Sequence, residues 1–167
     1  QTKEIVRKFN SVYGNTLVEP DALLSANKSC LRLPGTDGKA KMSKSLHNCI
    51  YLSDSEEDVR KKVMSMFTDP NHLQVSDPGQ VEGNPVFIYL EAFCRDGLFA
   101  EYLPEYANLE ELKAHYTRGG LGDVKVKKFL NNVLMEELSP IRNRRAKWEK
   151  DIPAVYEILQ KGSIAAR

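Results

Sequence analysis

The sequence of 167 residues has few cysteines, no long apolar run and almost no net charge. Its three cysteines, Cys30, Cys49 and Cys94, stand far apart without a C-x-x-C pair, which excludes the framework of a zinc ribbon or an iron–sulfur site. No apolar segment approaches the roughly 20 residues of a membrane span, so we expect no membrane partner. The formal net charge of +1 gives no general attraction to nucleic acid, so any surface that binds anions must be local.

The remaining composition is ordinary for a folded soluble protein, with 41% apolar and 28% charged residues. Unpatterned, unpaired cysteines fit the reducing cytoplasm, and no metal site is predicted. The length allows one good core or two small ones. Because Gln1 has no methionine before it and an amphipathic pattern begins at once, we expect a piece of a longer protein.

Apolar spacing predicts a mainly α-helical chain with a change of character near Ile50. Residues 1–50 are mixed and rich in loops, and a helix, a short strand and a glycine-rich loop fit the end of an α/β layer. Residues 51–167 are predicted to form a helical bundle. The predicted strand covers residues 31–33, and the predicted helices cover residues 2–13, 53–67, 84–93, 108–116, 123–138, 139–150 and 152–162.

Side chains that can cap a helix mark most of these predicted starts. They are Thr2, Ser53, Asn84, Asn108 and Asp123. The stripe predicted to be core in the helix from residue 123 consists of Val126, Phe129, Leu130, Val133, Leu134 and Leu138. His72 lies in the long loop over residues 68–83, and a lone loop histidine is more often a surface or capping group than a ligand.

A stretch rich in lysine and glycine, residues 35–45, is the strongest candidate for chemistry. Lys39, Lys41 and Lys44 fall within six residues, beside Ser43 and Ser45. Lysine ammonium groups and hydroxyls suit phosphate oxygens, and glycine permits close approach of a ligand, so the stretch fits a polyphosphate. It supplies no nucleophile or general base, so any catalysis rests on positioning and electrostatics. The alternative is a solvated basic loop.

A second candidate is a basic run with one aromatic residue near residue 145. Trp148 lies within the run Arg142, Arg144, Arg145, Lys147 and Lys150, and such a helix can hold phosphates and stack on unpaired bases. The alternative is a solvated helix face paired with nearby acids, with Trp148 packed inward.

The segment Lys41-Met42-Ser43-Lys44-Ser45 matches the K-M-S-K-S motif of class I aminoacyl-tRNA synthetases residue for residue. Three further matches narrow the resemblance: residues 33–38 with Asn48, residues 83–87, and the run from Lys127 to Arg145. Together they resemble the bacterial tryptophanyl-tRNA synthetases over essentially the whole chain.

This resemblance implies a ligase that activates tryptophan with ATP and Mg²⁺ and then charges tRNA(Trp). It implies that Lys41 and Lys44 are catalytic through the ATP phosphates, with Met42, Ser43 and Ser45 also binding ATP. It implies that residues 1–50 end a Rossmann-type catalytic domain and that residues 51–167 form a helical anticodon-binding domain. The tRNA contacts would then include Arg142, Arg144, Arg145 and Lys147, in a homodimeric parent enzyme in the cytoplasm.

The departures from the family pattern limit what this chain is expected to do alone. The H-I-G-H-like motif of the family is absent, so we expect a C-terminal fragment that cannot activate tryptophan by itself. Leu46-His47 replaces an acidic pair seen in many relatives, which we interpret as variation within the family. Three alternatives remain: a stand-alone helical RNA-binding module, a relative of the tyrosyl enzymes, and a helical interaction domain with an incidental basic loop.

Overall fold

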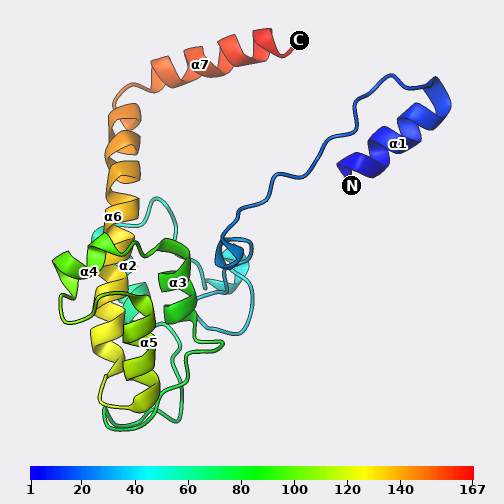
Figure 1. Cartoon of the computed structure of the whole chain (residues 1–167). Helices are drawn as coiled ribbons and strands as arrows, with labels where there is room; N and C mark the ends of the chain where they lie inside the picture. Colours follow the sequence, from blue (N-terminus) through cyan, green and yellow to red (C-terminus); the bar gives the residue numbers. More distant parts are fainter.

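The computed structural model describes residues 1–167, apart from the side chain of Lys28. The mainly helical architecture is confirmed (Figure 1). The helices are α1 (Thr2–Tyr13), α2 (Glu56–Met64), α3 (Pro85–Phe93), α4 (Gly97–Tyr102), α5 (Leu109–Arg118), α6 (Asp123–Glu149) and α7 (Ile152–Ala165), with short 3₁₀ helices η1 (Lys28–Cys30) and η2 (Lys44–Leu46).

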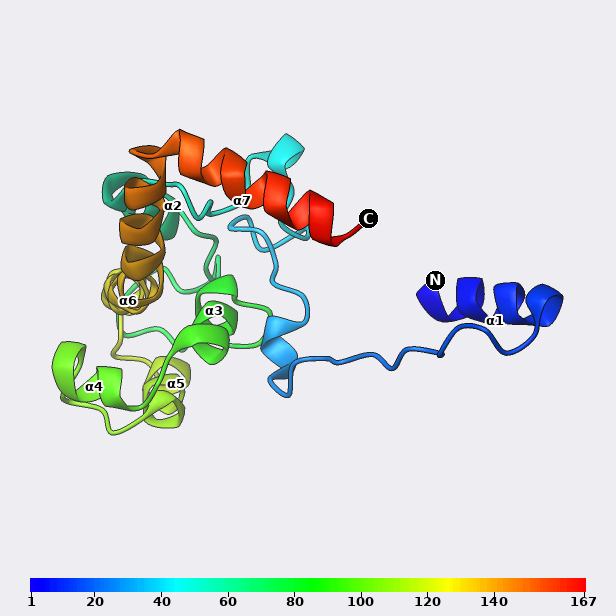
Figure 2. The same ribbon diagram turned by 90° about the horizontal axis from the view of Figure 1, so that it is seen from above.

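Helices α2 to α6 form a central body around the first half of α6. Figure 2 shows α2 and α5 on opposite sides of α6, with α3 beside it. Every residue of the predicted stripe on α6 is buried, which confirms that prediction. The rings of Phe99 in α4 and Phe129 in α6 lie 4.6 Å apart between centroids, so even the short helix α4 joins this core.

The outer helices α1 and α7 lie away from this body (Figures 1 and 2). An extended segment, residues 14–27, joins α1 to the rest of the chain, and α7 turns aside at the end of α6. Only Val6 is buried on the apolar face of α1, and no residue of α7 is buried. These two helices therefore form with little tertiary packing.

Two predicted helix boundaries near the C-terminus are wrong. Ser139-Pro140 does not open a new helix, because α6 continues through Pro140. Proline costs one hydrogen bond there, but Leu138 and Ile141 pack against the core on either side and keep the helix together. Helix α7 likewise continues through Gly162 to Ala165, since glycine in a helix is unfavourable and not forbidden.

The predicted strand at residues 31–33 is also wrong. In the described part of the chain, the β pairing is a single antiparallel bridge between Pro34 and Lys41. Residues 31–33 themselves follow the 3₁₀ helix η1 as a turn and a bend. Residues 31–33 find no extended segment to pair with among the described residues, and a strand needs such a partner to satisfy its backbone groups.

The predicted N-caps Asn84 and Asn108 are confirmed, since each side chain accepts a hydrogen bond from its own first turn. The other three are wrong. Ser55 replaces Ser53 as the cap of α2 and accepts a hydrogen bond of 3.1 Å from the backbone N–H of Asp58. Gln1 precedes α1 and Gly122 precedes α6 without a side-chain cap. Helix α4 has no counterpart among the predicted helices, because its short length gives little periodicity.

Candidate functional site

The lysine loop, which we define as residues 34–48, folds back on itself in a tight turn. The backbone N–H of Gly35 donates to the carbonyl of Ala40 at 2.7 Å, and that of Gly38 donates to the carbonyl of Gly35 at 3.0 Å. Gly38 has a φ of +68°, in the left-handed region that favours glycine. The turn therefore brings the chain before the lysines against the chain that carries Lys41.

The buried side chain of Asn48 organises this loop. Its Oδ1 accepts a hydrogen bond of 2.8 Å from the backbone N–H of Ser43, while its Nδ2 donates to Asp37 at 3.2 Å and to the Lys41 carbonyl at 3.3 Å. A Cβ on Gly35 would lie only 2.1 Å from the Asn48 Nδ2, so glycine is required for this approach. One amide thus sets the shape of the loop on both sides of Lys41.

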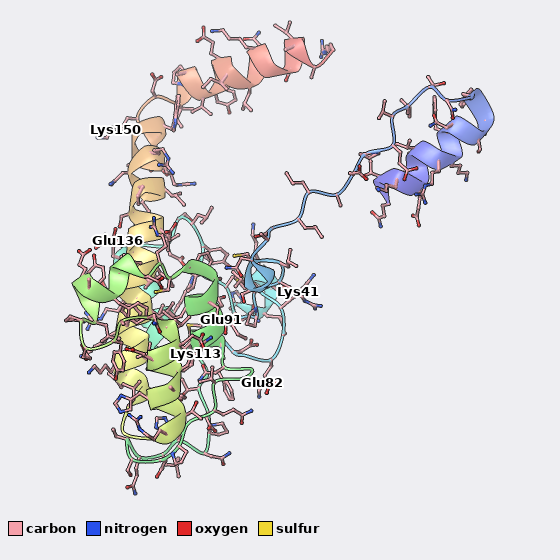
Figure 3. All side chains as sticks on the ribbon, in the orientation of Figure 1. Lys41, Glu82, Glu91, Lys113, Glu136 and Lys150 are labelled. Carbon is pink, nitrogen blue, oxygen red and sulfur yellow. The ribbon has the colours of Figure 1, made fainter. Side chains whose placement is uncertain are left out.

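Two aromatic residues of the central body hold the loop in place. The hydroxyl of Tyr89 in α3 donates to the Pro34 carbonyl at 2.8 Å, and burial raises the pKa of this hydroxyl, which keeps the donor protonated. The backbone N–H of Phe67, just after α2, donates to the Thr36 carbonyl at 2.9 Å. The loop is therefore docked on the helical body at the level of α3, where Figure 3 labels Lys41.

The lysines of the loop point into solvent. Lys39, Lys41 and Lys44 are exposed, and no ion pair joins them to any described residue. The nearby carboxylate of Asp37 is engaged otherwise: burial raises its pKa, but hydrogen bonds from the Lys39 backbone and from Asn48 outweigh burial and hold the pKa below its usual value. With three lysines against one carboxylate, the loop therefore presents a net positive charge.

The structure brings together only some of the predicted loop residues. Lys39 and Lys41 line a shallow pocket of about 290 Å³ together with Arg32. Arg32 is not among the site residues predicted from the sequence. Lys44 lies outside that lining, at the start of η2. The hydroxyl groups of Ser43 and Ser45 lie 2.8 Å apart. This arrangement can hold an extended anion across more than one contact point.

Asn48 and Tyr89 are the site residues whose roles sequence reasoning missed. A polar residue directly before the apolar run from Cys49 is the available signal for Asn48, and the structure shows it to be 3% exposed. Tyr89 is separated from its partner Pro34 by 55 positions, and no local pattern links the two.

The basic surface, Arg142, Arg144, Arg145 and Lys147, belongs to the second half of α6, which begins against α2 and then extends away from the central body (Figure 1). Arg144 and Lys147 are exposed, and no ion pair joins them to a described residue, whereas Arg145 pairs with Glu149 at 2.7 Å. Arg142 is half-buried and donates to Glu56 at 3.2 Å and to Ser139 at 3.1 Å. The surface is therefore partly free and partly engaged.

Trp148 is 49% exposed, so the alternative in which it packs inward is wrong. An exposed indole beside free cations has the chemistry needed to stack on an unpaired base.

His72 is buried, contrary to the expectation of a surface or capping residue. Its Nδ1 lies 3.0 Å from Oδ1 of Asp123, which also accepts a hydrogen bond of 2.6 Å from the Tyr116 hydroxyl. Burial raises the pKa of Asp123, but the hydrogen bonds from Tyr116, His72 and Thr68 outweigh burial and hold it below its usual value. The cluster ties the loop over residues 68–83 to the start of α6.

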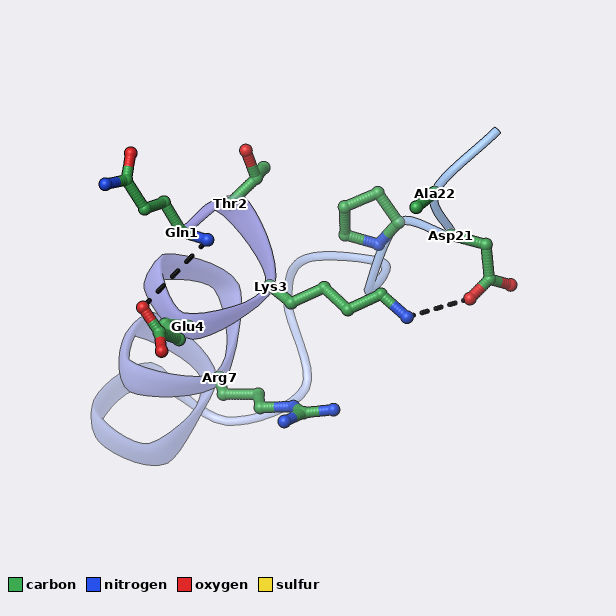
Figure 4. A pocket seen from close by; sticks show the side chains of 8 residues that line it. Gln1, Thr2, Lys3, Glu4, Arg7, Asp21 and Ala22 are labelled. Carbon is green, nitrogen blue, oxygen red and sulfur yellow. Dashed lines mark hydrogen bonds and ion pairs between the residues drawn. The ribbon is translucent and has the colours of Figure 1, made fainter. Parts of the chain in front are cut away.

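A wider hollow of about 570 Å³ lies between α1 and residues 20–22 (Figure 4). Lys3 pairs with Asp21 at 2.9 Å across it, and Arg7 pairs with Glu19 at 2.6 Å nearby. These ion pairs hold α1 against the segment that follows it, so the hollow is a junction between the two. Across the described residues, no group of three His, Cys, Asp or Glu side chains is placed to hold a metal.

A membrane span is not among the described helices, since none is both long and apolar enough to cross a bilayer.

The family model described as "tRNA synthetases class I (W and Y)" matches residues 1–139. The chain is 60% identical over its whole length to a tryptophan–tRNA ligase of Clostridium longisporum, and covers 46% of that protein. It is 54% identical over its whole length to a tryptophan–tRNA ligase of Streptococcus pyogenes, and covers 47% of that protein. The chain thus spans less than half the length of the curated relatives it matches.

Solved structures give the same relationship. The crystal structure of tryptophanyl-tRNA synthetase from Campylobacter jejuni, complexed with ADP and tryptophan, is similar with a TM-score of 0.71 and 27% identity, over 99% of this chain and 47% of that one. Tyrosyl-tRNA synthetase from Aeropyrum pernix is less similar, with a TM-score of 0.54 and 25% identity over 84% of this chain and 38% of that one. The chain belongs to the class I tRNA synthetases of the tryptophan and tyrosine family.

Proposed function

We propose that this chain is the part of a tryptophan–tRNA ligase that carries the lysine loop and the helical domain. The observation that carries the proposal is that Lys41 and Lys44 stand exposed, without an ion pair among the described residues, on a loop held by Asn48. Relatives at 54–60% identity are tryptophan–tRNA ligases, which favours tryptophan over tyrosine as the substrate.

The proposed reaction has two steps. The tryptophan carboxylate attacks the α-phosphorus of ATP, forming tryptophanyl-adenylate as the bond to the leaving pyrophosphate breaks. A ribose hydroxyl at the 3′ end of tRNA(Trp) then attacks the carbonyl carbon of the adenylate, and AMP leaves as the ester bond to tRNA forms. Lys41 and Lys44 hold the phosphates and stabilise the charge that develops on pyrophosphate. Ser43 and Ser45 add hydroxyl contacts, and the backbone of Met42 lies near the adenine. Mg²⁺ enters as part of the ATP complex and neutralises phosphate charge.

The residues fit a polyphosphate ligand. Three lysines in six positions repel one another unless an anion lies among them, and the single carboxylate of Asp37 offsets only one of their three charges. Lys39, Lys41 and Arg32 face one shallow pocket, so part of the anion has a defined place to bind.

We further propose that residues 1–50 end the catalytic domain and that residues 51–167 form the anticodon-binding domain. The basic surface, Arg142, Arg144, Arg145 and Lys147, contacts the phosphates of tRNA(Trp) in this proposal. The tryptophan pocket and the remainder of the ATP site belong to the part of the enzyme that the relatives have in addition. The enzyme acts as a cytoplasmic homodimer.

Replacement of Lys44 tests this proposal in the full-length enzyme that carries this sequence. We expect Lys44→Ala to lower the rate of tryptophan-dependent ATP–pyrophosphate exchange by roughly 100- to 1000-fold, because a preorganised charge at the leaving group is lost. Tryptophan affinity should change less than about twofold, since Lys44 acts on the phosphates.

Lys61→Ala is the matched control, because Lys61 is also exposed but lies on α2 and pairs with Glu57. It should leave the exchange rate unchanged. An exchange rate in Lys44→Ala equal to that of the wild type would refute the role of Lys44. A wild-type enzyme that shows no tryptophan-dependent exchange would refute the proposed function.

A further inference from the structure

We propose that a groove between α2 and α6 binds an unpaired nucleotide of RNA. The inference rests on the proposed function, because it assigns part of the tRNA to a surface of this chain. The α2–α6 groove consists of two adjoining pockets of about 350 and 290 Å³ that share Arg60 and Asn131. Its residues are Glu56, Glu57, Arg60, Met64, Lys128, Asn131, Asn132 and Met135.

Helical spacing explains why these residues form one continuous groove. On α2, Arg60 and Met64 are four positions apart and share a face. On α6, Lys128, Asn132 and Met135 follow one another at four and three positions and line the facing wall. The groove therefore runs along the packed contact of α2 and α6, and each helix forms one of its walls.

The free charge in the groove is positive. Arg60 and Lys128 are exposed, and no ion pair joins either of them to a described residue. The two carboxylates at the other end are already paired: Glu57 with Lys61 at 2.7 Å and Glu56 with Arg142 at 3.2 Å. An anionic group is therefore favoured at the end where Arg60 and Lys128 meet.

Two adjacent carboxamides lie next to these cations without hydrogen bonds to the described residues. The Oδ1 atom of Asn131 is buried and unpartnered, which is unusual for a polar atom in a packed helix pair. Asn132 lies beside it and is half-exposed. A carboxamide offers both a donor and an acceptor, which is the combination that reads the edge of a nucleobase.

Apolar surface completes the groove, since Met64 and Met135 contribute half-buried thioether side chains to the walls. Cations for a phosphate, amides for a base edge and an adaptable apolar surface for its face together fit a nucleotide better than a peptide carboxylate. Because these groups are few and close together, the site suits one unpaired nucleotide and not a duplex.

The groove also continues into the basic surface. Nη2 of Arg142, the first residue of that surface, lies 3.4 Å from Sδ of Met135, which lines the groove. From Lys128 to Arg142 the helix rises about 21 Å over fourteen residues. An RNA strand whose phosphates contact the basic surface can therefore extend along α6 and place a base in the groove.

The test measures tRNA(Trp) binding by the full-length enzyme as a function of salt concentration. We expect Arg60→Ala and Lys128→Ala each to weaken binding roughly tenfold and to reduce the slope of log Kd against log salt by about 0.7, because each removes one phosphate contact. Asn132→Ala should weaken binding to a similar extent without changing the slope, because an amide contact to a base displaces no counterion.

Arg118→Ala is the matched control, since Arg118 is an exposed arginine at the end of α5. Helix α5 lies on the side of α6 opposite α2 (Figure 2). It should leave both Kd and slope unchanged, and urea unfolding should show that all four variants are folded. If the groove variants bind tRNA with the same Kd and salt slope as Arg118→Ala, the inference is overturned. A groove that binds an acidic peptide in place of RNA would give this result. Pyrophosphate exchange by the unchanged enzyme needs no tRNA, so failure of the proposed function is seen separately.

Discussion

The central body and the outer helices have similar apolar patterns in sequence but opposite surroundings in the fold. Val133 of α6 and Leu112 of α5 are completely buried, whereas Ile5 of α1 and Ile158 of α7 are 67% and 54% exposed. Helices α5 and α6 lie among the other helices of the body, whereas α1 and α7 extend away from it (Figures 1 and 2). Apolar periodicity therefore predicts that a helix forms, while the presence of a packing partner depends on the rest of the fold.

The difference also separates two sources of helix stability. Most helical stability in proteins comes from packing an apolar face, and isolated helices of 12 to 15 residues are marginal in water. Helix α1 instead relies on ion pairs such as Arg7–Glu19 with the segment that follows it. Exposed ion pairs contribute about 0 to 1 kcal/mol each, so we expect α1 and α7 to open far more readily than the central body.

Truncation of one leucine in each region should show the largest contrast. Leu130→Ala removes a completely buried side chain of α6 and should lower the free energy of unfolding by about 3 kcal/mol, through lost burial and a residual cavity. Leu159→Ala removes the same atoms from a side chain of α7 that is 60% exposed, and should cost less than about 0.5 kcal/mol. Urea unfolding of both variants measures this difference, and equal losses would show that α7 packs as tightly as α6.

Titration of a carboxylate in each region should give an intermediate contrast. The lowered pKa of Asp123 means that its ionised form is stabilised by folding, so it contributes stability above the usual carboxyl pKa near 4. This contribution is lost as the pH falls through the lowered pKa. The free-energy advantage of the wild type over Asp123→Asn should therefore shrink by about 1 kcal/mol or less between pH 6 and pH 3, because solvent screens part of the interaction.

The matched carboxylate is Glu19, whose pKa is lowered by its hydrogen bond to Arg7. Glu19 is an exposed residue of the outer region, so solvent screens its ion pair with Arg7. Glu19→Gln should therefore leave the pH dependence of global unfolding unchanged. Thermal unfolding across this pH range compares the two variants. A difference for Asp123→Asn that stays constant with pH would contradict the assigned role of its ionised form.

Local signals in the sequence are sufficient for much of the fold. The caps Asn84 and Asn108 and the apolar stripe on α6 each depend on residues within a turn or two, and all are confirmed. The errors lie where distant contacts decide the outcome. Pro140 favours the start of a new helix, and packing of Leu138 and Ile141 against the body overrides that preference.

The candidate site shows the same limit. The residue types of the lysine loop are enough to predict exposed side chains that suit an anion, since lysines so close in sequence repel one another and seek solvent or a ligand. The hydrogen bonds that shape the loop are not predictable in this way, because Tyr89 and Phe67 lie outside the motif and reach it only through the fold. The role of Asn48 likewise depends on a chain reversal that places it beside Asp37, eleven residues earlier.

The smallest expected effect on global stability comes from a change in the helix backbone of α7. A Cβ on Gly162 would meet nothing within 4 Å, so Gly162→Ala adds no clash and favours the local helix by about 1 kcal/mol. That corresponds to roughly fivefold slower amide exchange in α7. Because α7 contributes no buried residue to the body, the midpoint of global urea unfolding should stay the same. A raised midpoint would show that α7 unfolds together with the central body, and the two regions would then form one cooperative unit.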